Sequence, residues 1–160
     1  FTASRAEKKV RDRLEELGVE CFLPVQTVLR QWTYRKSRVV VPVIAGLVFV
    51  RVSRQEQVKV LQTKGVVAFL RLKGEAGAAV IPDKQMEDFR FLLDFSEEAV
   101  EMTNENIKAG DLVRVVKGSL RGMEGELIRH KGVTKVLVRI DMLGCAMVNI
   151  PASFVEKLNK

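Results

Sequence analysis

The 160-residue sequence is poor in the side chains that most often carry catalytic or metal chemistry, with one histidine and two cysteines. Cys21 and Cys145 lie in different halves of the chain, which gives neither a disulfide framework nor the ligand spacing of a zinc site. We expect both to be reduced core residues. His130 stands beside Lys131 and Gly132, a setting typical of an exposed turn. We therefore predict no metal and no cofactor.

Long hydrophobic segments are also missing. The longest apolar run, residues 39–50, contains Pro42 and Gly46 and is shorter than the roughly 20 residues needed to cross a bilayer. The basic stretch after Phe1 lacks the apolar core of a cleavable signal. We expect a cytoplasmic protein without membrane contact. Because the sequence starts at Phe1 without methionine, we also expect that a short upstream segment is missing.

Motifs for nucleotide binding and covalent catalysis are absent as well. Gly118, Gly122 and Gly125 lie between expected strands, and no Gly-Lys-Ser/Thr follows them, which excludes a phosphate-binding loop. Ser119 and Ser153 lack the context of a nucleophile elbow. We predict a binding protein and not an enzyme.

Charge is abundant, and it is unevenly distributed. Residues 1–52 carry ten Lys/Arg against five Asp/Glu, and residues 107–160 repeat those counts. Residues 96–106 contain four glutamates and no base. This pattern predicts two basic modules, residues 1–95 and 107–160, joined by an acidic, flexible linker at residues 96–106.

The sequence of the first module predicts alternating helices and strands. A capping box from Ser4 to Glu7 predicts the start of a helix that ends near Gly18. On its outer side we expect a basic ridge of Arg5, Lys9 and Arg13. A second capping box from Ser53 opens another helix, and Pro82-Asp83 starts a third. Strands are expected at residues 20–23, 26–34, 38–43, 47–52 and 66–72.

These elements favour an α+β sandwich, because hairpin-length connections imply a largely antiparallel sheet. Residues 35–37 are predicted to form a charged hairpin tip. In the second module, strands at residues 111–117, 124–129, 135–140 and 147–150 alternate with glycine-containing turns. A small closed β-barrel is the predicted outcome.

Both modules carry motifs of one known family. Residues 110–118 (GDLVRVVKG), 122–125 (GMEG) and 153–158 (SFVEKL) resemble the KOW motif of the NusG/Spt5 family. Residues 5–9 (RAEKK), 21–24 (CFLP) and 42–50 (PVIAGLVFV) look like successive signatures of the NusG amino-terminal (NGN) domain, in the same order and spacing. The resemblance covers essentially the whole chain. It implies an α/β sandwich with an antiparallel sheet, followed by an SH3-like KOW β-barrel.

The sequence also departs from the usual family pattern. Residues 44–47 read IAGL where the family usually has Phe-Pro-Gly-Tyr, and residues 118–120 read GSL in place of Gly-Pro-Phe. The barrel hairpin carries Leu143-Gly144 where Phe-Gly is usual. These differences suggest a specialised bacterial paralogue of the RfaH/UpxY antiterminator type.

The resemblance implies a monomeric transcription elongation and antitermination regulator that acts on RNA polymerase. Its first domain would grip the clamp helices of the polymerase through Phe1, Ile44, Ala45, Gly46 and Leu47. Taken alone, Ile44 and Leu47 are better interpreted as core residues, and only the resemblance over the whole chain favours the polymerase contact. The barrel would recruit a ribosomal protein or a termination factor, with Leu120, Leu143 and Gly144 as candidate contacts.

Basic and aromatic residues of the first module are candidates for contact with the non-template DNA strand, namely Arg5, Lys9, Arg13, Trp32, Arg35, Lys36 and Arg38. A solvated charged face is the competing interpretation. A second functional class stays open, in which the protein is a ribosome-associated or RNA-binding KOW protein. In that case the arginines of the barrel would hold RNA, namely Arg114, Arg121, Arg129 and Arg139.

Overall fold

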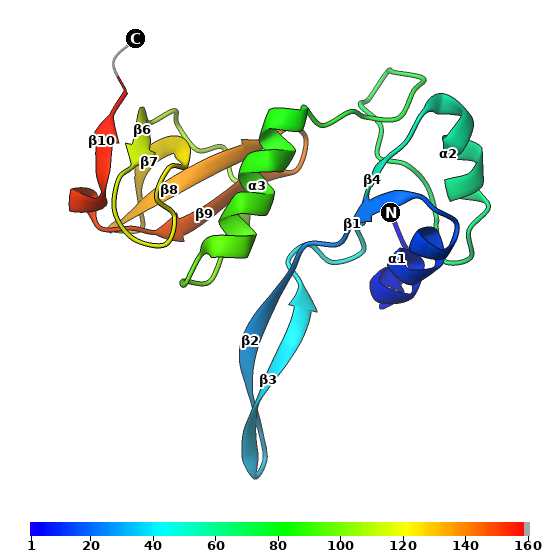
Figure 1. Ribbon diagram of the computed structural model, residues 1–160, viewed down its shortest axis with the longest axis horizontal. Helices are drawn as coiled ribbons and strands as arrows, with labels where there is room; N and C mark the ends of the chain where they lie inside the picture. The colour runs from blue at the N-terminus through cyan, green and yellow to red at the C-terminus, as the bar shows by residue number, and fades with distance from the viewer. Residues whose placement is uncertain (159–160) are drawn as a thin grey trace. The chain divides into compact units, whose positions relative to one another are not determined.

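The computed structural model describes residues 1–158, apart from the side chain of Trp32, and the chain forms two compact units (Figure 1). The first unit is Phe1–Val80 and the second is Ile81–Lys160. The sequence places a domain boundary after residue 95, whereas the structure separates the units before the third helix. Each unit is described by itself.

The first unit contains two helices and two small antiparallel sheets. Its elements are α1 (Glu7–Glu16), β1 (Glu20–Phe22), β2 (Val25–Trp32), β3 (Arg35–Pro42), β4 (Phe49–Arg51) and α2 (Arg54–Leu61). β1 pairs with β4, and β2 pairs with β3. The strand expected at residues 66–72 is reduced to one bridge between Thr2 and Val66. The α+β class with antiparallel pairing is confirmed, but the single larger sheet is not seen.

Helix α1 begins later than the capping box predicts. Its N-cap is Ala6, which makes no side-chain cap hydrogen bond, and Arg5 has a left-handed φ of 59°. The Ala6 amide donates to the Ala3 carbonyl at 3.1 Å, and the Ala3 amide donates to the Gly65 carbonyl at 2.8 Å. A turn anchored to a distant segment therefore precedes the helix, and Ser4 does not cap it.

Helix α2 has the cap that its sequence predicts. The Glu56 amide donates to Ser53 Oγ at 3.3 Å, and the Ser53 amide donates to Glu56 Oε1 at 3.2 Å. These reciprocal bonds satisfy amides that would otherwise lack partners at the helix start. The apolar sides of both helices meet in a core of four buried residues, namely Val10, Leu14, Val19 and Val60.

The second unit contains one helix and a six-stranded antiparallel sheet. Its elements are α3 (Asp83–Phe95), β5 (Glu101–Thr103), β6 (Asp111–Val115), β7 (Glu124–His130), β8 (Val133–Ile140), β9 (Gly144–Asn149), a 3-10 turn (Ala152–Phe154) and β10 (Val155–Lys157). The strand order is β10-β6-β7-β8-β9-β5. The four predicted strands are present. The closed SH3-like barrel stays a prediction.

Both faces of the central strand β8 are buried. Val136 and Ile140 lie on one face, and they are 0% and 1% exposed. Leu137, on the opposite face, is also 1% exposed. A strand covered on one side alternates apolar and polar residues, whereas burial on both sides gives a nearly continuous apolar run. Other parts of the chain must therefore cover both faces of the sheet at β8.

Helix α3 packs against β8 and supplies part of that cover (Figure 1). Phe89 and Leu92 on the helix are fully buried. At its first turn the Gln85 amide nitrogen donates to Asp141 Oδ1 at 2.9 Å, and the Asp141 amide donates to Gln85 Oε1 at 2.8 Å. These contacts hold the third helix in the second compact unit, while the domain boundary after residue 95 stays a prediction.

The segment predicted as a flexible linker also takes part in the sheet. Residues 101–103 form strand β5, which pairs with β9 through Glu101↔Met147, Met102↔Ala146 and Thr103↔Cys145. The acidic composition of residues 96–106 indicates solvation when it is considered locally. The structure instead places two of the four glutamates, Glu101 and Glu105, next to Lys135 and His130 of the sheet.

Candidate functional site

The residues proposed to bind polymerase meet at one end of the first unit, where three separate segments are joined by main-chain hydrogen bonds. The Thr2 amide donates to the Gly46 carbonyl at 2.9 Å, which ties the amino-terminal residues to the loop at residues 44–47. On its other side, the Phe1 main-chain nitrogen donates to the Ala68 carbonyl at 2.6 Å, and the Val67 amide donates to the Phe1 carbonyl at 2.8 Å. Phe1 and residues 44–47 are therefore brought together, and their binding to polymerase stays a prediction.

The members of this group differ in accessibility. Leu47 is only 5% exposed, so it belongs to the core and offers little contact area. Phe1 is 47% exposed, and Val67, which the sequence did not single out, is 65% exposed. Ala45 is exposed, whereas Ile44 is half-buried. We define the apolar end surface as Phe1, Ile44, Ala45 and Val67.

Gly46 shapes this loop through its backbone. Its φ of +73° lies in the left-handed region, which is readily available only to glycine. A Cβ at this position would lie in ordinary contact, 3.9 Å from the Thr2 carbonyl oxygen. The glycine is therefore required for its backbone conformation, and it positions the carbonyl that receives the Thr2 amide.

The β2–β3 hairpin carries the candidate nucleic-acid contacts. Its turn is Thr33–Tyr34, and Tyr34 is 97% exposed. The predicted tip at residues 35–37 is therefore wrong by two positions, because Arg35 already pairs with Trp32 inside the ladder. The turn lies at the far end of the hairpin from the helices of this unit (Figure 1).

The ladder register sorts the bases of this hairpin onto two faces. Lys36 and Arg38 pair with Gln31 and Leu29 and share one face. Arg35 lies on the other face, together with Arg30, which sequence reasoning missed although it alternates with Trp32. The side chain of Trp32 lies outside the described part of the structure. Because residues 25–42 contain no aspartate or glutamate, both faces of the hairpin are electropositive.

The predicted basic ridge of α1 is not a continuous row. Arg5 precedes the helix, so it does not follow the helical spacing of the other two. Lys9 is exposed, but Arg13 is half-buried and its Nη1 donates to the Lys64 carbonyl at 2.7 Å. The ridge therefore offers one free base in the helix and one in the preceding turn.

One known protein family matches the whole first unit and the start of the second. The family model described as "Transcription termination factor nusG" matches residues 1–90, which is more than half of the chain. The chain belongs to the NusG family. The match extends from the apolar end surface through the hairpin and into α3. The NusG family is a family of transcription factors, so the protein is assigned to transcription at that level.

Other comparisons add less. A crystal structure of an MjSpt4:Spt5 complex in conformation B is similar over 99% of this chain and 94% of that chain, with 17% sequence identity and a TM-score of 0.23. A likeness at that score carries no argument. No curated protein matches the chain. Among the described residues, no helix is long and apolar enough to span a membrane.

In the second unit of this NusG-family chain, the predicted partner contacts are mostly covered. Leu120 is 6% exposed and packs in the core, and Leu143 is half-buried. Gly144 has a φ of +103°, and a Cβ there would collide with the Thr103 carbonyl oxygen. The strand β5 thus lies directly against the hairpin that the resemblance singled out.

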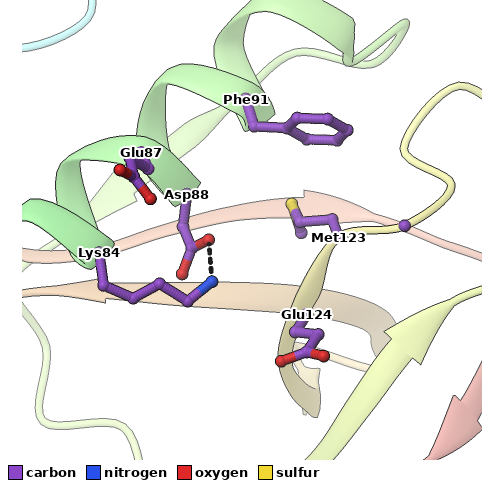
Figure 2. Close-up of a pocket in the computed structure, with 7 residues that line it drawn as sticks. Lys84, Glu87, Asp88, Phe91, Met123 and Glu124 are labelled. Atoms are coloured by element: carbon purple, nitrogen blue, oxygen red, sulfur yellow. Dashed lines mark hydrogen bonds and ion pairs between the residues drawn. The ribbon is translucent and has the colours of Figure 1, made fainter.

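One cavity lies beside α3, and its charges are largely compensated (Figure 2). Its volume is about 330 Å³. Lys84 Nζ lies 2.8 Å from Asp88 Oδ1, one turn further along α3, and Glu124 Oε1 accepts from Arg114 Nη2 at 3.0 Å. No group of three or more His, Cys, Asp or Glu among the described residues could hold a metal ion. The lining residues are Lys84, Glu87, Asp88, Phe91, Gly122, Met123 and Glu124.

Proposed function

We propose that this NusG-family protein is a transcription elongation and antitermination regulator of the RfaH/UpxY type. Its amino-terminal domain, residues 1–95, would bind the clamp helices of RNA polymerase, and the KOW domain, residues 107–160, would recruit a further factor. The protein would then act in the cytoplasm, at the nucleoid, wherever polymerase is transcribing.

The observation that carries this proposal is the apolar end surface. Phe1 and Val67 are about half exposed or more, although they lie on a framework fixed by four main-chain hydrogen bonds. An exposed apolar surface on rigid backbone binds a partner without first losing conformational freedom. A helical pair such as the clamp would cover it, because apolar side chains on one face of a helix suit a shallow apolar surface.

The hairpin supports a second contact, with the displaced non-template DNA strand. Its four bases, Arg30, Arg35, Lys36 and Arg38, stand in a segment without acidic residues. Phosphates would supply the missing counter-charge, and such binding weakens as salt rises. The fully exposed Tyr34 ring is available to stack on an unpaired base.

The alternative of a ribosome-associated or RNA-binding KOW protein is less well supported. Two of the four arginines that would hold RNA already have carboxylate partners within the unit. Arg114 pairs with Glu124 at 3.0 Å, and Arg139 pairs with Glu126 at 2.6 Å. Bases that are already paired gain less from a phosphate, because the existing ion pair must first be broken.

The proposal is tested by placing a charge on the apolar end surface. We expect Ala45→Asp to reduce binding to a fragment carrying the polymerase clamp helices at least tenfold, because an unpaired carboxylate would be desolvated in an apolar contact. Val58→Asp is the matched control, since Val58 is an apolar residue of α2 that is 57% exposed. Fluorescence anisotropy with a labelled clamp fragment measures both affinities.

Circular dichroism of the two variants checks that the first unit remains folded. If Ala45→Asp and Val58→Asp bind the clamp fragment as tightly as the parent protein, the end surface is not the polymerase contact. Equal weakening by both variants would also contradict the proposal, because it would show that the effect does not depend on the position of the charge.

A further inference from the structure

The acidic segment after α3 lies along the sheet of the second unit and is bound to it by charged side chains. Strand β5 forms one edge of this sheet. Glu101 Oε2 lies 2.6 Å from Lys135 Nζ, and Glu105 Oε2 lies 3.1 Å from His130 Nε2. Both bases belong to the β7–β8 hairpin. We call residues 101–110 the strap.

The carboxyl-terminal part of the strap is held by a charged side chain of β8, Arg139. Arg139 Nη2 donates to the Ile107 carbonyl at 2.8 Å, while its Nε donates to Glu126 Oε2 at 2.6 Å. Glu126 Oε1 in turn accepts from the Gly110 amide at 3.1 Å. The Arg139–Glu126 ion pair therefore binds the main chain of the strap at two positions, Ile107 and Gly110.

Beneath the strap lies an apolar strip. Ile107 packs against four buried residues that line one face of the sheet, namely Ile128, Leu137, Cys145 and Met147. This is the second face of β8, opposite the face that carries Val136 and Ile140. The strap thus explains the burial of Leu137 that an exposed barrel surface would not give.

The closed arrangement contains one unsatisfied group. Among the described side chains, the buried nitrogen or oxygen without a hydrogen-bond partner is His130 Nδ1. A buried polar atom without a partner destabilises the state that buries it.

We propose that the strap is a releasable cover, held on the sheet mainly by charge, whose opening frees the edge of β9 and uncovers the apolar strip around Leu137 and Met147. A three-residue edge strand has few ladder hydrogen bonds, so it opens at lower free energy than the central strands. While the strap is closed, no other strand can pair with β9 at residues 145–147. The proposal concerns the second unit alone and does not depend on the polymerase contact.

Cys145 provides a reporter for this opening. It is 3% exposed beneath the strap, and burial raises the pKa of its thiol, so the closed state reacts slowly with an alkylating reagent. With Cys21 replaced by Ser, alkylation of the whole chain by iodoacetamide reports on Cys145. We expect the labelling rate to rise with sodium chloride concentration, because salt screens the Glu101–Lys135 ion pair and the contact of Arg139 with the Ile107 carbonyl.

Charge-reversal variants identify the contacts responsible. Lys135→Glu and Glu101→Lys should each raise the labelling rate about fivefold or more, as expected for loss of one ion pair between buried Lys135 and exposed Glu101. The double variant, which restores the pair with exchanged signs, should return toward the parent rate. Arg129→Glu is the matched control, because it makes the same change in net charge on an exposed part of β7.

Hydrogen exchange distinguishes local opening from global unfolding. The proposal requires the backbone amides of β5 to exchange faster in the single variants, with the amides of β8 unchanged. If β5 and β8 exchange together, the strap is an integral part of the folded unit and is not a cover. Salt-independent labelling, or no rescue in the double variant, would show that charge does not hold the strap.

Discussion

The β2–β3 hairpin and the β7–β8 hairpin are both long, basic and antiparallel, yet they use their charges in opposite ways. Residues 25–42 hold four bases and no acid. In the β7–β8 hairpin, Lys135 lies 2.6 Å from Glu101 and Arg139 lies 2.6 Å from Glu126. Bases with carboxylate partners within the same unit stabilise the fold. Bases in an acid-free segment remain available for an external anion.

The apolar residues of the two hairpins should differ most in their effect on stability. Leu137→Ala in β8 is expected to lower the free energy of unfolding of the second unit by about 2–5 kcal/mol, since it leaves a cavity in a fully buried site. Leu29→Ala in β2 should change it by about 0.5 kcal/mol or less, because Leu29 is 63% exposed. Urea unfolding measures both changes.

Similar losses at both positions would mean that the β2–β3 hairpin is covered in solution by something that holds Leu29 as tightly as the sheet holds Leu137. The proposed difference between an exposed β2–β3 hairpin and a buried β7–β8 hairpin would then be wrong.

Replacing an arginine should affect folding stability in the β7–β8 hairpin and DNA binding in the β2–β3 hairpin. Arg139→Ala is expected to destabilise the second unit by about 1–2 kcal/mol, a value reduced from that of a buried charged hydrogen bond because the side chain is partly solvated. Arg38→Ala should leave stability unchanged and should lower the slope of DNA affinity against salt by roughly 0.7. The measurements are urea unfolding and binding to a single-stranded oligonucleotide across a salt series.

If Arg139→Ala reduced the DNA salt slope as much as Arg38→Ala, then both hairpins would contact phosphate, and the division of roles between them would be wrong.

The smallest expected difference is in the response to acid. The hydrogen bond from Lys135 holds the pKa of Glu101 below its ordinary value of 4.5. The contribution of this contact to strap stability is therefore complete above pH 4.5 and is lost as the pH falls through the lower folded-state pKa. Exchange of the β5 amides, corrected for the intrinsic effect of pH, should accelerate in that range.

The β2–β3 hairpin has no acidic residue, so its amides should show no matching acceleration. An equal response in both hairpins would indicate general acid unfolding instead of the loss of one ion pair.

Elements with local signals could be predicted from the sequence. The Ser53 capping box and the start of α3 at Asp83 were found, because caps and proline act within a few residues of themselves. The Ser4 capping box predicted a helix start in the same way, but Ser4 does not cap helix α1 in the structure. There the chain before the helix is fixed by a hydrogen bond to Gly65, which lies far away in sequence.

The same reasoning explains what was missed in the candidate site. Val67 joins the apolar end surface only because its amide donates a hydrogen bond to the Phe1 carbonyl. No local sequence pattern predicts that pairing. The acidic composition of residues 96–106 is typical of a linker. Its contact with Lys135 spans 34 positions, so a local window cannot show that Glu101 has a partner. The distribution of charge can be read from the sequence, whereas the pairing of those charges required the fold.

The loop between Leu70 and Ala79 has a practical use for engineering this protein. Its base is closed by a hydrogen bond of 2.7 Å from the Ala79 amide to the Leu70 carbonyl, and residues 71–77 are exposed. At Gly74, a Cβ would meet no atom within 4 Å. Lengthening an exposed loop is thermodynamically mild, at about 0.6 kcal/mol for each doubling. A fluorescent label or small tag inserted after Gly74 would therefore be tolerated, and it would lie outside both the hairpin and the strap.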